Sequence, residues 1–215
     1  MDITAAAATA RLAVASRLDI PVPEAIDYRG EGVVDFVNDR VWLRDRATTE
    51  RFESEPTRSL SARLAFRLLS RTIGRERDLY FDGGALATWT KRKGWSEPTG
   101  DRYGPKFTRH PLCIWTPVFL APRASRSSEG AEEIRGCFAA PYEVTLTPDE
   151  VDNGVWAHIA PAGGPEIKAV LWLDAEQRIR RMSYQSSFDD AGQSVLWSIT
   201  ELWDFGAAID ARPPA

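Results

Sequence analysis

Two carboxylates in apolar strand patterns are the residues of this sequence best placed for acid–base chemistry. Glu201 alternates with Ile199 and Trp203, and Asp35 lies in a valine-rich segment. A carboxyl group that points into an apolar hollow has a raised pKa, and it can act as a general acid or bind a ligand amine. Exposure to water, or pairing with one of the many arginines, is the favoured reading. If the protein is an enzyme, we expect its acid among Glu201, Asp35 and His158.

Histidine and the common catalytic motifs add little to this chemistry. The sequence has two histidines, His110 near Cys113 and His158 near Asp152. Either pair is a conceivable dyad, although two surface histidines are the favoured reading, and neither pair is enough for a metal site. The sequence has no nucleophile elbow, no HExxH pair and no phosphate-binding loop. We therefore expect no metal and no cofactor.

Tryptophan is abundant, with 8 residues in a chain of 215. Flat amphipathic rings build pockets for extended or polycyclic apolar ligands, although core packing alone explains most tryptophans. The candidate ligand-binding residues are Trp42, Trp89, Trp172, Tyr184, Trp197 and Trp203.

The last third of the chain must position several of these rings. Residues 167–174, 178–188 and 194–205 alternate between apolar and polar side chains as half-buried strands do, and polar turns at 174–177 and 189–192 join them. The third strand places Trp197, Glu201 and Trp203 on one face. A sheet with such a face either covers a core or lines a hollow.

The rest of the chain predicts further strands and three helices. Residues 28–52 and 132–146 read as strands, and Asp82-Gly83-Gly84 is a hairpin signal between two more. Alanine-rich residues 4–17 predict an amphipathic N-terminal helix within residues 1–20, and residues 57–72 and 148–158 predict two others. Hairpin-linked strands dominate, so we expect an α+β fold of one curved antiparallel sheet with helices packed on one side.

Size and composition indicate an ordinary globular protein. The chain has 43% hydrophobic and 27% charged residues and a net charge of −4, so a single domain over residues 1–215 with a short tail at 207–215 is expected. Mild acidity and the lack of a basic stripe argue against binding nucleic acid. Cys113 and Cys137 read as two buried thiols, with one disulfide as the alternative.

The N-terminus bears on location. Residues 1–12 lack the charged start, apolar stretch and cleavage site of a secretory signal, and no segment approaches the roughly 20 apolar residues of a membrane span. We expect no integral membrane segment. The expected location is the cytoplasm if Met1 is the native start, and the cell envelope otherwise.

Several structural phrases along the chain resemble the LolA-like lipoprotein-carrier superfamily, especially the actinobacterial LppX and LprG type. They span roughly residues 25 to 210 and occur at turns and strand starts. The phrases are GEGVVDF at 30–36, DLYFDG at 78–83 followed by Trp89 and by Gly94-Trp95, EEIRG at 132–136, LWLDAEQRIRR at 171–181 and LWDFG at 202–206.

The resemblance implies an open half-barrel of about 8 to 11 strands with helices packed on its concave side. Proteins of this kind receive acyl chains or other apolar ligands in the hollow, without a metal or covalent cofactor. The actinobacterial relatives are secreted lipoproteins with a signal peptide and an acylated cysteine, and this sequence shows neither.

The favoured function is therefore non-catalytic binding or carrying of a lipid or other hydrophobic small molecule between sheet and helices. The alternative is a cyclase or isomerase that folds a flexible hydrophobic substrate in the same hollow and uses a buried carboxylate or histidine as its acid or base. A third possibility is a regulatory partner of an envelope or sigma-factor system. The sequence identifies no protein partner.

Overall fold

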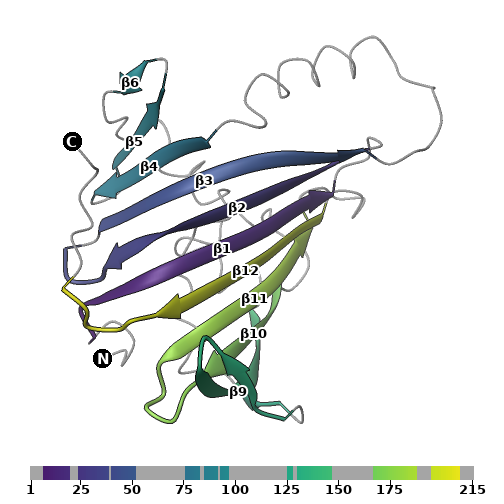
Figure 1. Ribbon diagram of the computed structural model, residues 1–215. Coiled ribbons are helices and arrows are strands. Elements are labelled where there is room, and N and C mark those ends of the chain that lie inside the picture. Colours follow the sequence, from purple (N-terminus) through teal and green to yellow (C-terminus); the bar gives the residue numbers. More distant parts are fainter. Residues whose placement is uncertain are drawn as a thin grey trace.

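The computed structural model describes residues 7–19, 24–38, 40–51, 76–82, 85–91, 93–96, 125–127, 130–146, 167–187 and 195–208. They form twelve β-strands and no helix (Figure 1). The strands are β1 (Thr9–Asp19), β2 (Glu24–Asp35), β3 (Arg40–Arg51), β4 (Glu76–Asp82), β5 (Ala85–Thr90), β6 (Gly94–Trp95), β7 (Ser125–Arg126), β8 (Glu132–Ile134), β9 (Cys137–Leu146), β10 (Ile167–Leu173), β11 (Ile179–Ser187) and β12 (Val195–Trp203). The helices predicted at 57–72 and 148–158 lie outside these ranges.

All pairings are antiparallel, which confirms the predicted sheet. The strand order is β6-β5-β4-β3-β2-β1-β12-β11-β10-β9-β7, and β8 pairs only with β9. This path does not close on itself among the described strands, and its strand number lies at the top of the predicted range. Most neighbours in the sheet are also neighbours in sequence, because hairpins join them. The exceptions are β7 with β9 and the central pair β1 and β12, which brings the first and last described strands together.

Bonds near the termini fix that central pair. The Thr9 hydroxyl donates to the Ala207 carbonyl at 2.6 Å, and the Gly206 amide donates to the Thr9 carbonyl at 2.9 Å. The β1 strand pairs with β12 over nine residues, from Arg11 opposite Trp203 to Asp19 opposite Val195. The first and last strands therefore form the middle of the sheet, and both halves depend on their pairing.

The N-terminal helix expected from the sequence is wrong, because residues 9–19 are strand β1. Alanine favours helices, but Ala10, Leu12, Val14 and Ser16 also repeat at every second position, and all four side chains are buried. The apolar spacing fits both periods. Pairing on both edges, with β2 and β12, decides in favour of the strand.

The register divides the sheet into two faces, since cross-strand partners share a face. We call the face with the even-numbered side chains of β1 the inner face and the opposite one the outer face. The buried side chains of the inner face include those of Ala10, Leu12, Val14, Ser16, Val34, Val41, Leu43, Leu79, Val144, Ala169, Leu171, Met182, Tyr184, Ser198, Thr200 and Leu202. The outer face carries Arg11, Ala13, Ala15, Arg29, Glu31, Val33, Trp42, Arg44, Arg46, Glu76, Asp78, Trp89, Trp172, Arg181, Ser183, Trp197, Ile199, Glu201 and Trp203.

Two glycines of β2 allow the sheet to bend toward the inner face. A Cβ at Gly32 would lie within 2.8 Å of the Leu43 Cα and still closer to the Trp42 carbonyl oxygen, and one at Gly30 would lie 3.0 Å from the Arg44 carbonyl oxygen. Gly30 and Gly32 occupy inner-face positions, so the backbone of β3 crowds β2 on that side. A side chain there would push the two strands apart. The backbones of β2 and β3 therefore lie close together on the inner face.

The described residues contain no helix long and apolar enough to cross a membrane.

Candidate functional site

The inner face is apolar along several successive rows of cross-strand neighbours. One row runs through Leu202, Leu12, Gly32, Leu43 and Leu79, and its four leucines are at most 2% exposed. These leucines belong to the core cluster that also includes Ala10, Val14, Val34 and Val41, with Phe36 and Phe205 packed against it. A second row continues the apolar surface onto the other half of the sheet through Leu171 and Met182. The inner face thus carries aliphatic side chains on both sides of β1.

One row of the inner face differs, because it consists of hydroxyl-bearing side chains. Tyr184, Ser198, Ser16 and Tyr28 are successive cross-strand neighbours on β11, β12, β1 and β2. The hydroxyls of Ser16 and Ser198 are 2.9 Å apart and hydrogen-bonded, and both residues are at most 5% exposed. Buried hydroxyls need such partners, because an unsatisfied polar group costs about 1 to 3 kcal/mol. We call these four residues the hydroxyl row.

This arrangement suits an amphipathic molecule. Aliphatic rows can contact an acyl chain or another apolar body, and the hydroxyl row can hydrogen-bond to a polar end. Of the ligand-binding residues predicted from the sequence, Tyr184 is the one on this face. The sequence prediction did not include Ser16 and Ser198, because their register opposite Tyr184 depends on pairings between distant strands.

The five predicted tryptophans lie together on the outer face. They are Trp42, Trp89, Trp172, Trp197 and Trp203. Three of them lie beside guanidinium groups: Arg135 is 4.4 Å from the ring centre of Trp203, Arg181 is 5.3 Å from that of Trp172, and Arg44 is 5.6 Å from that of Trp42. Trp197 is 49% exposed. Sequence alternation grouped the rings of β12 correctly, but their face is the charged one.

Glu201, the first acid candidate, is held by arginines on the outer face. Its Oε1 accepts from the Arg181 side chain, with the shortest distance 2.9 Å, and its Oε2 accepts from Arg135 Nε at 2.9 Å. Arg181 also reaches Glu132 at 2.7 Å. This network ties β12 to β11 and to the turn between β8 and β9. Glu201 therefore has the arginine pairing that was the favoured reading of its sequence position.

Asp35, the second acid candidate, organises the turn after β2. Its carboxylate accepts hydrogen bonds from the backbone amides of Val37 and Asn38, both at 3.0 Å, and from the Asn38 side chain at 2.6 Å. Partial burial acts to raise the pKa of Asp35, but these bonds and the charge of Arg40 outweigh it, so the pKa lies below its ordinary value. The raised pKa of a buried general acid is thus absent at Asp35. His158, the third candidate, lies outside the described residues.

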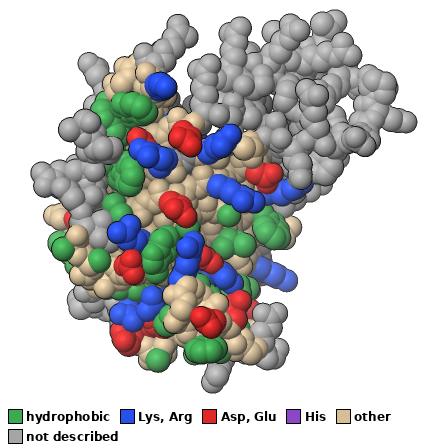
Figure 2. All heavy atoms as spheres, viewed as in Figure 1, with side chains coloured by type: hydrophobic (Ala, Val, Ile, Leu, Met, Phe, Trp, Pro, Cys, Tyr) green, Lys and Arg blue, Asp and Glu red, His purple; other side chains and the backbone are tan. Residues whose placement is uncertain are grey.

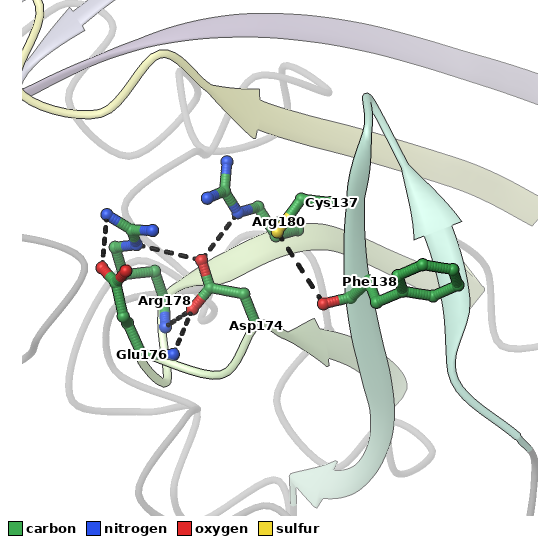
Figure 3. Close-up of polar contacts among 6 residues, drawn as sticks. All are labelled: Cys137, Phe138, Asp174, Glu176, Arg178 and Arg180. Atoms are coloured by element: carbon green, nitrogen blue, oxygen red, sulfur yellow. Dashed lines mark hydrogen bonds and ion pairs between the residues drawn. The ribbon is translucent and has the colours of Figure 1, made fainter.

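A buried carboxylate that the sequence suggested only as a turn residue is Asp174 (Figure 3). Its side chain is 2% exposed. Oδ1 accepts from the amides of Glu176 and Arg178, both at 2.9 Å, and Oδ2 accepts from the Nε atoms of Arg178 at 2.9 Å and Arg180 at 2.7 Å. Burial acts to raise the pKa of Asp174, yet the bonds from Arg178 and Arg180 and the positive charge of Arg180 bring it below its ordinary value. Both arginines also lie against the Phe205 ring, at 5.1 and 4.8 Å from its centre.

Cys137 carries a free thiol in the structure, and its Sγ donates to the carbonyl of Phe138 at 3.8 Å (Figure 3). Its proposed partner Cys113 lies outside the described residues. Within the described part of the chain, no group of three or more His, Cys, Asp or Glu side chains could hold a metal ion.

The outer face also has an open trough of about 780 Å³. Among the described residues, five arginines, three glutamates and two tryptophans line it, and Ala13, Ala15, Val33 and Ile199 contribute small or aliphatic surface. Figure 2 shows the exposed face of the sheet with basic and acidic side chains interspersed with hydrophobic ones. This trough could not be predicted from the sequence, because its lining comes from five different strands and a turn.

Comparisons with known proteins find similar solved structures at low sequence identity. No family model and no curated protein matches the chain. Over its full length the chain is similar to the crystal structure of LprF from Mycobacterium bovis, with 12% identity, 93% of that chain covered and a TM-score of 0.47. Over 91% of its length it is similar to a LolA superfamily protein, NE2245 from Nitrosomonas europaea, with 12% identity, 84% of that chain covered and a TM-score of 0.30.

Proposed function

We propose that this protein binds a lipid or another hydrophobic small molecule, without catalysis, against the concave inner face of its sheet. The observation that carries the proposal is the composition of that face. Aliphatic rows from both halves of the sheet adjoin the hydroxyl row, in which Tyr184, Ser198 and Ser16 are buried. A sheet that only needed a core would gain nothing from the hydroxyls, since burying them costs free energy that their hydrogen bonds roughly offset.

The close approach of β2 and β3 supports the same proposal. Gly30 and Gly32 allow this approach on the inner face, and we expect the sheet to bend around that side. A bent sheet leaves space that side chains alone fill poorly, and apolar ligands occupy such space readily. In this arrangement the apolar body of the ligand lies against the leucine rows and its polar end lies at the hydroxyl row.

The cyclase or isomerase alternative has no comparable support among the described residues. Glu201 is ion-paired to two arginines on the opposite face, and Asp35 has a lowered pKa in a turn. Neither carboxylate belongs to the inner face. The proposal therefore assigns the inner face a binding role only.

Ligand extraction tests the proposal directly. We expect organic-solvent extracts of the purified protein to contain a defined apolar or amphipathic molecule by mass spectrometry. Protein stripped of that molecule is expected to bind a fluorescent fatty acid in a one-to-one ratio. Folded protein that releases no such molecule and binds no apolar probe would contradict the proposal.

Paired variants locate the polar end of the ligand. Replacing both serines, Ser16→Ala with Ser198→Ala, removes a hydrogen bond without leaving either serine partner unsatisfied, so stability should change by less than about 1 kcal/mol. Affinity for a fatty acid should fall about fivefold or more, by the loss of about one hydrogen bond, while affinity for a plain hydrocarbon stays the same. Ser183→Ala on the outer face of β11 is the matched control and should change neither affinity. Equal affinities in all three proteins would remove the hydroxyl row from the site.

A further inference from the structure

Two arginines in the outer-face trough stand directly opposite each other without partners. Arg29 of β2 and Arg46 of β3 are cross-strand neighbours, and both are exposed. Within the described part of the chain, neither guanidinium forms an ion pair or a hydrogen bond. Like charges at directly opposed positions destabilise an antiparallel pair. The sheet therefore carries an electrostatic cost at this position.

Other arginines around the trough are neutralised. Arg44, two residues from Arg46, binds Asp78 at 2.8 Å, and Arg11 binds Asp204 at 3.1 Å. Arg135 is paired to Glu201. Arg29 and Arg46 are thus the two trough arginines whose guanidinium donors no described carboxylate occupies. Such donors can bind an oxyanion.

Two glutamates lie near the arginine pair and offset its charge, but they do not bind its guanidinium groups. Glu76 of β4 stands opposite Arg46, and Glu31 follows Arg29 two positions along β2 on the same face. Both line the trough, yet neither makes an ion pair with a described residue. They lower the positive potential without occupying the guanidinium groups. The donors of Arg29 and Arg46 remain available to a ligand.

Beside the arginines the trough has a small, apolar floor. Ala15 is the cross-strand neighbour of Arg29 on one side and of Ile199 on the other. Ala13 lies two positions before Ala15 on β1 and on the same face. Trp203 lies on β12, the strand of Ile199. Ala13, Ala15, Ile199 and Trp203 all line the trough. Alanines between larger side chains leave room for a short apolar chain.

We propose that this trough is a second ligand site, in which Arg29 and Arg46 bind the oxyanion of an amphipathic molecule, a phosphate or a carboxylate, and its apolar part lies over Ala13, Ala15 and Ile199. Planar guanidinium groups bind such oxyanions through paired, charge-assisted hydrogen bonds. An oxyanion between the two arginines also removes the like-charge repulsion. The site lies on the face opposite the one proposed to hold the hydrophobic ligand, and the two proposals are independent.

Titration with hexyl phosphate and with uncharged hexanol, followed by calorimetry and tryptophan fluorescence, tests the site. We expect hexyl phosphate to bind and hexanol to bind at least about tenfold more weakly, with the phosphate affinity falling as salt is added. Arg29→Gln combined with Arg46→Gln should weaken hexyl phosphate by about tenfold or more without lowering the melting temperature, because a repulsive pair is removed. Should that double variant unfold, Arg46→Gln alone gives the same comparison with a smaller loss.

Matched variants separate this site from general charge and from the inner face. Lys91→Gln with Lys93→Gln removes two exposed charges outside the trough and should change affinity less than about twofold. Glu31→Gln with Glu76→Gln should raise affinity about two- to fivefold, because two nearby negative charges are removed. Ser16→Ala with Ser198→Ala should leave hexyl phosphate binding unchanged. Equal losses in the arginine and lysine variants, or no loss in the arginine variant, would overturn the proposal.

Competition with inorganic phosphate identifies the source of the oxyanion. Displacement of hexyl phosphate by millimolar phosphate, lost in the Arg29→Gln, Arg46→Gln variant, would identify a free anion as sufficient. Failure of phosphate to compete would identify the headgroup of an amphiphile. Both results support an oxyanion site at the arginine pair, whereas competition that persists in the arginine variant would place the anion elsewhere.

Discussion

The two faces of the sheet are formed by the same strands but carry different kinds of side chain. On β12, Ser198, Thr200 and Leu202 are buried on the inner face, whereas Trp197, Glu201 and Trp203 lie between them on the outer face. The inner face contains aliphatic groups and hydroxyls, and the outer face contains aromatic rings and ion pairs. The five tryptophans therefore do not mark the buried face of this protein. Arginine makes the difference, since its guanidinium covers an indole ring while its charge stays in water.

The largest expected contrast between the faces concerns packing. Leu12→Ala on the inner face removes a fully buried side chain, so the free energy of unfolding should fall by about 4 kcal/mol. Ile199→Ala on the outer face, beside the open trough, should cost only about 1 kcal/mol. Urea denaturation measures both values. Equal losses would mean that the outer face is covered as fully as the inner face.

The Asp174 cluster should show the next largest effect. Asp174→Asn leaves Arg178 and Arg180 without a buried carboxylate, and the free energy of unfolding should fall by about 2 to 3 kcal/mol at neutral pH. The lowered pKa of Asp174 means that its carboxylate stabilises the folded state fully above its ordinary pKa. This contribution is lost as pH falls from about 4 through the folded-state pKa.

Denaturation as a function of pH checks this assignment. The difference in stability between the native protein and the Asp174→Asn variant should shrink on acidification below about pH 4. A difference that stays constant down to pH 2 would show that the Asp174 charge contributes nothing.

The ion pair between Arg181 and Glu201 should show a smaller effect. Both side chains are about one-fifth exposed, and a double-mutant cycle with Arg181→Gln and Glu201→Gln should give a coupling free energy of about 1 kcal/mol that decreases in 1 M salt. A coupling near zero would leave the outer-face network without a stabilising role. A coupling that salt does not alter would indicate a desolvated pair.

Trp197→Ala should have the smallest effect on stability, below about 0.5 kcal/mol, because the ring is 49% exposed. The effect of this variant on ligand binding distinguishes the two faces more clearly than its effect on stability does. We expect the affinity for a fluorescent fatty acid to be unchanged in Trp197→Ala and to fall severalfold in Tyr184→Phe, which loses one hydroxyl of the hydroxyl row. The reverse order would assign the hydrophobic ligand to the outer face.

Local patterns in the sequence predicted much of the sheet. The hairpins around Asp82, Gly136, Asp174 and Gly192 depend on turn residues and on alternation, and the paired strands on either side of each are present in the structure. The predicted N-terminal helix was wrong because a local apolar pattern can fit a helix and a strand equally well. Residues 9–19 satisfy both periods, and the strands that pair with them come from residues 24–35 and 195–203.

The site was harder to predict than the sheet. Alternation shows which side chains of a strand share a face, but it does not show which face the rest of the chain covers. The hydroxyl row needs Ser16 beside Ser198, and the Glu201 network needs Arg135, 66 residues away in sequence. Arg29 and Arg46 become a pair only through the register of β2 and β3. Such contacts follow from pairing between strands, which residue types and spacing leave open.

Photo-crosslinking with a diazirine-bearing fatty acid tests the central claim, that the two faces have separate roles, most directly. After irradiation and digestion, mass spectrometry locates the labelled peptides. The account predicts adducts on inner-face residues such as Val14, Met182 and Tyr184, and their loss when excess unlabelled fatty acid is present. Adducts confined to outer-face residues such as Ile199 and Trp203 would contradict it.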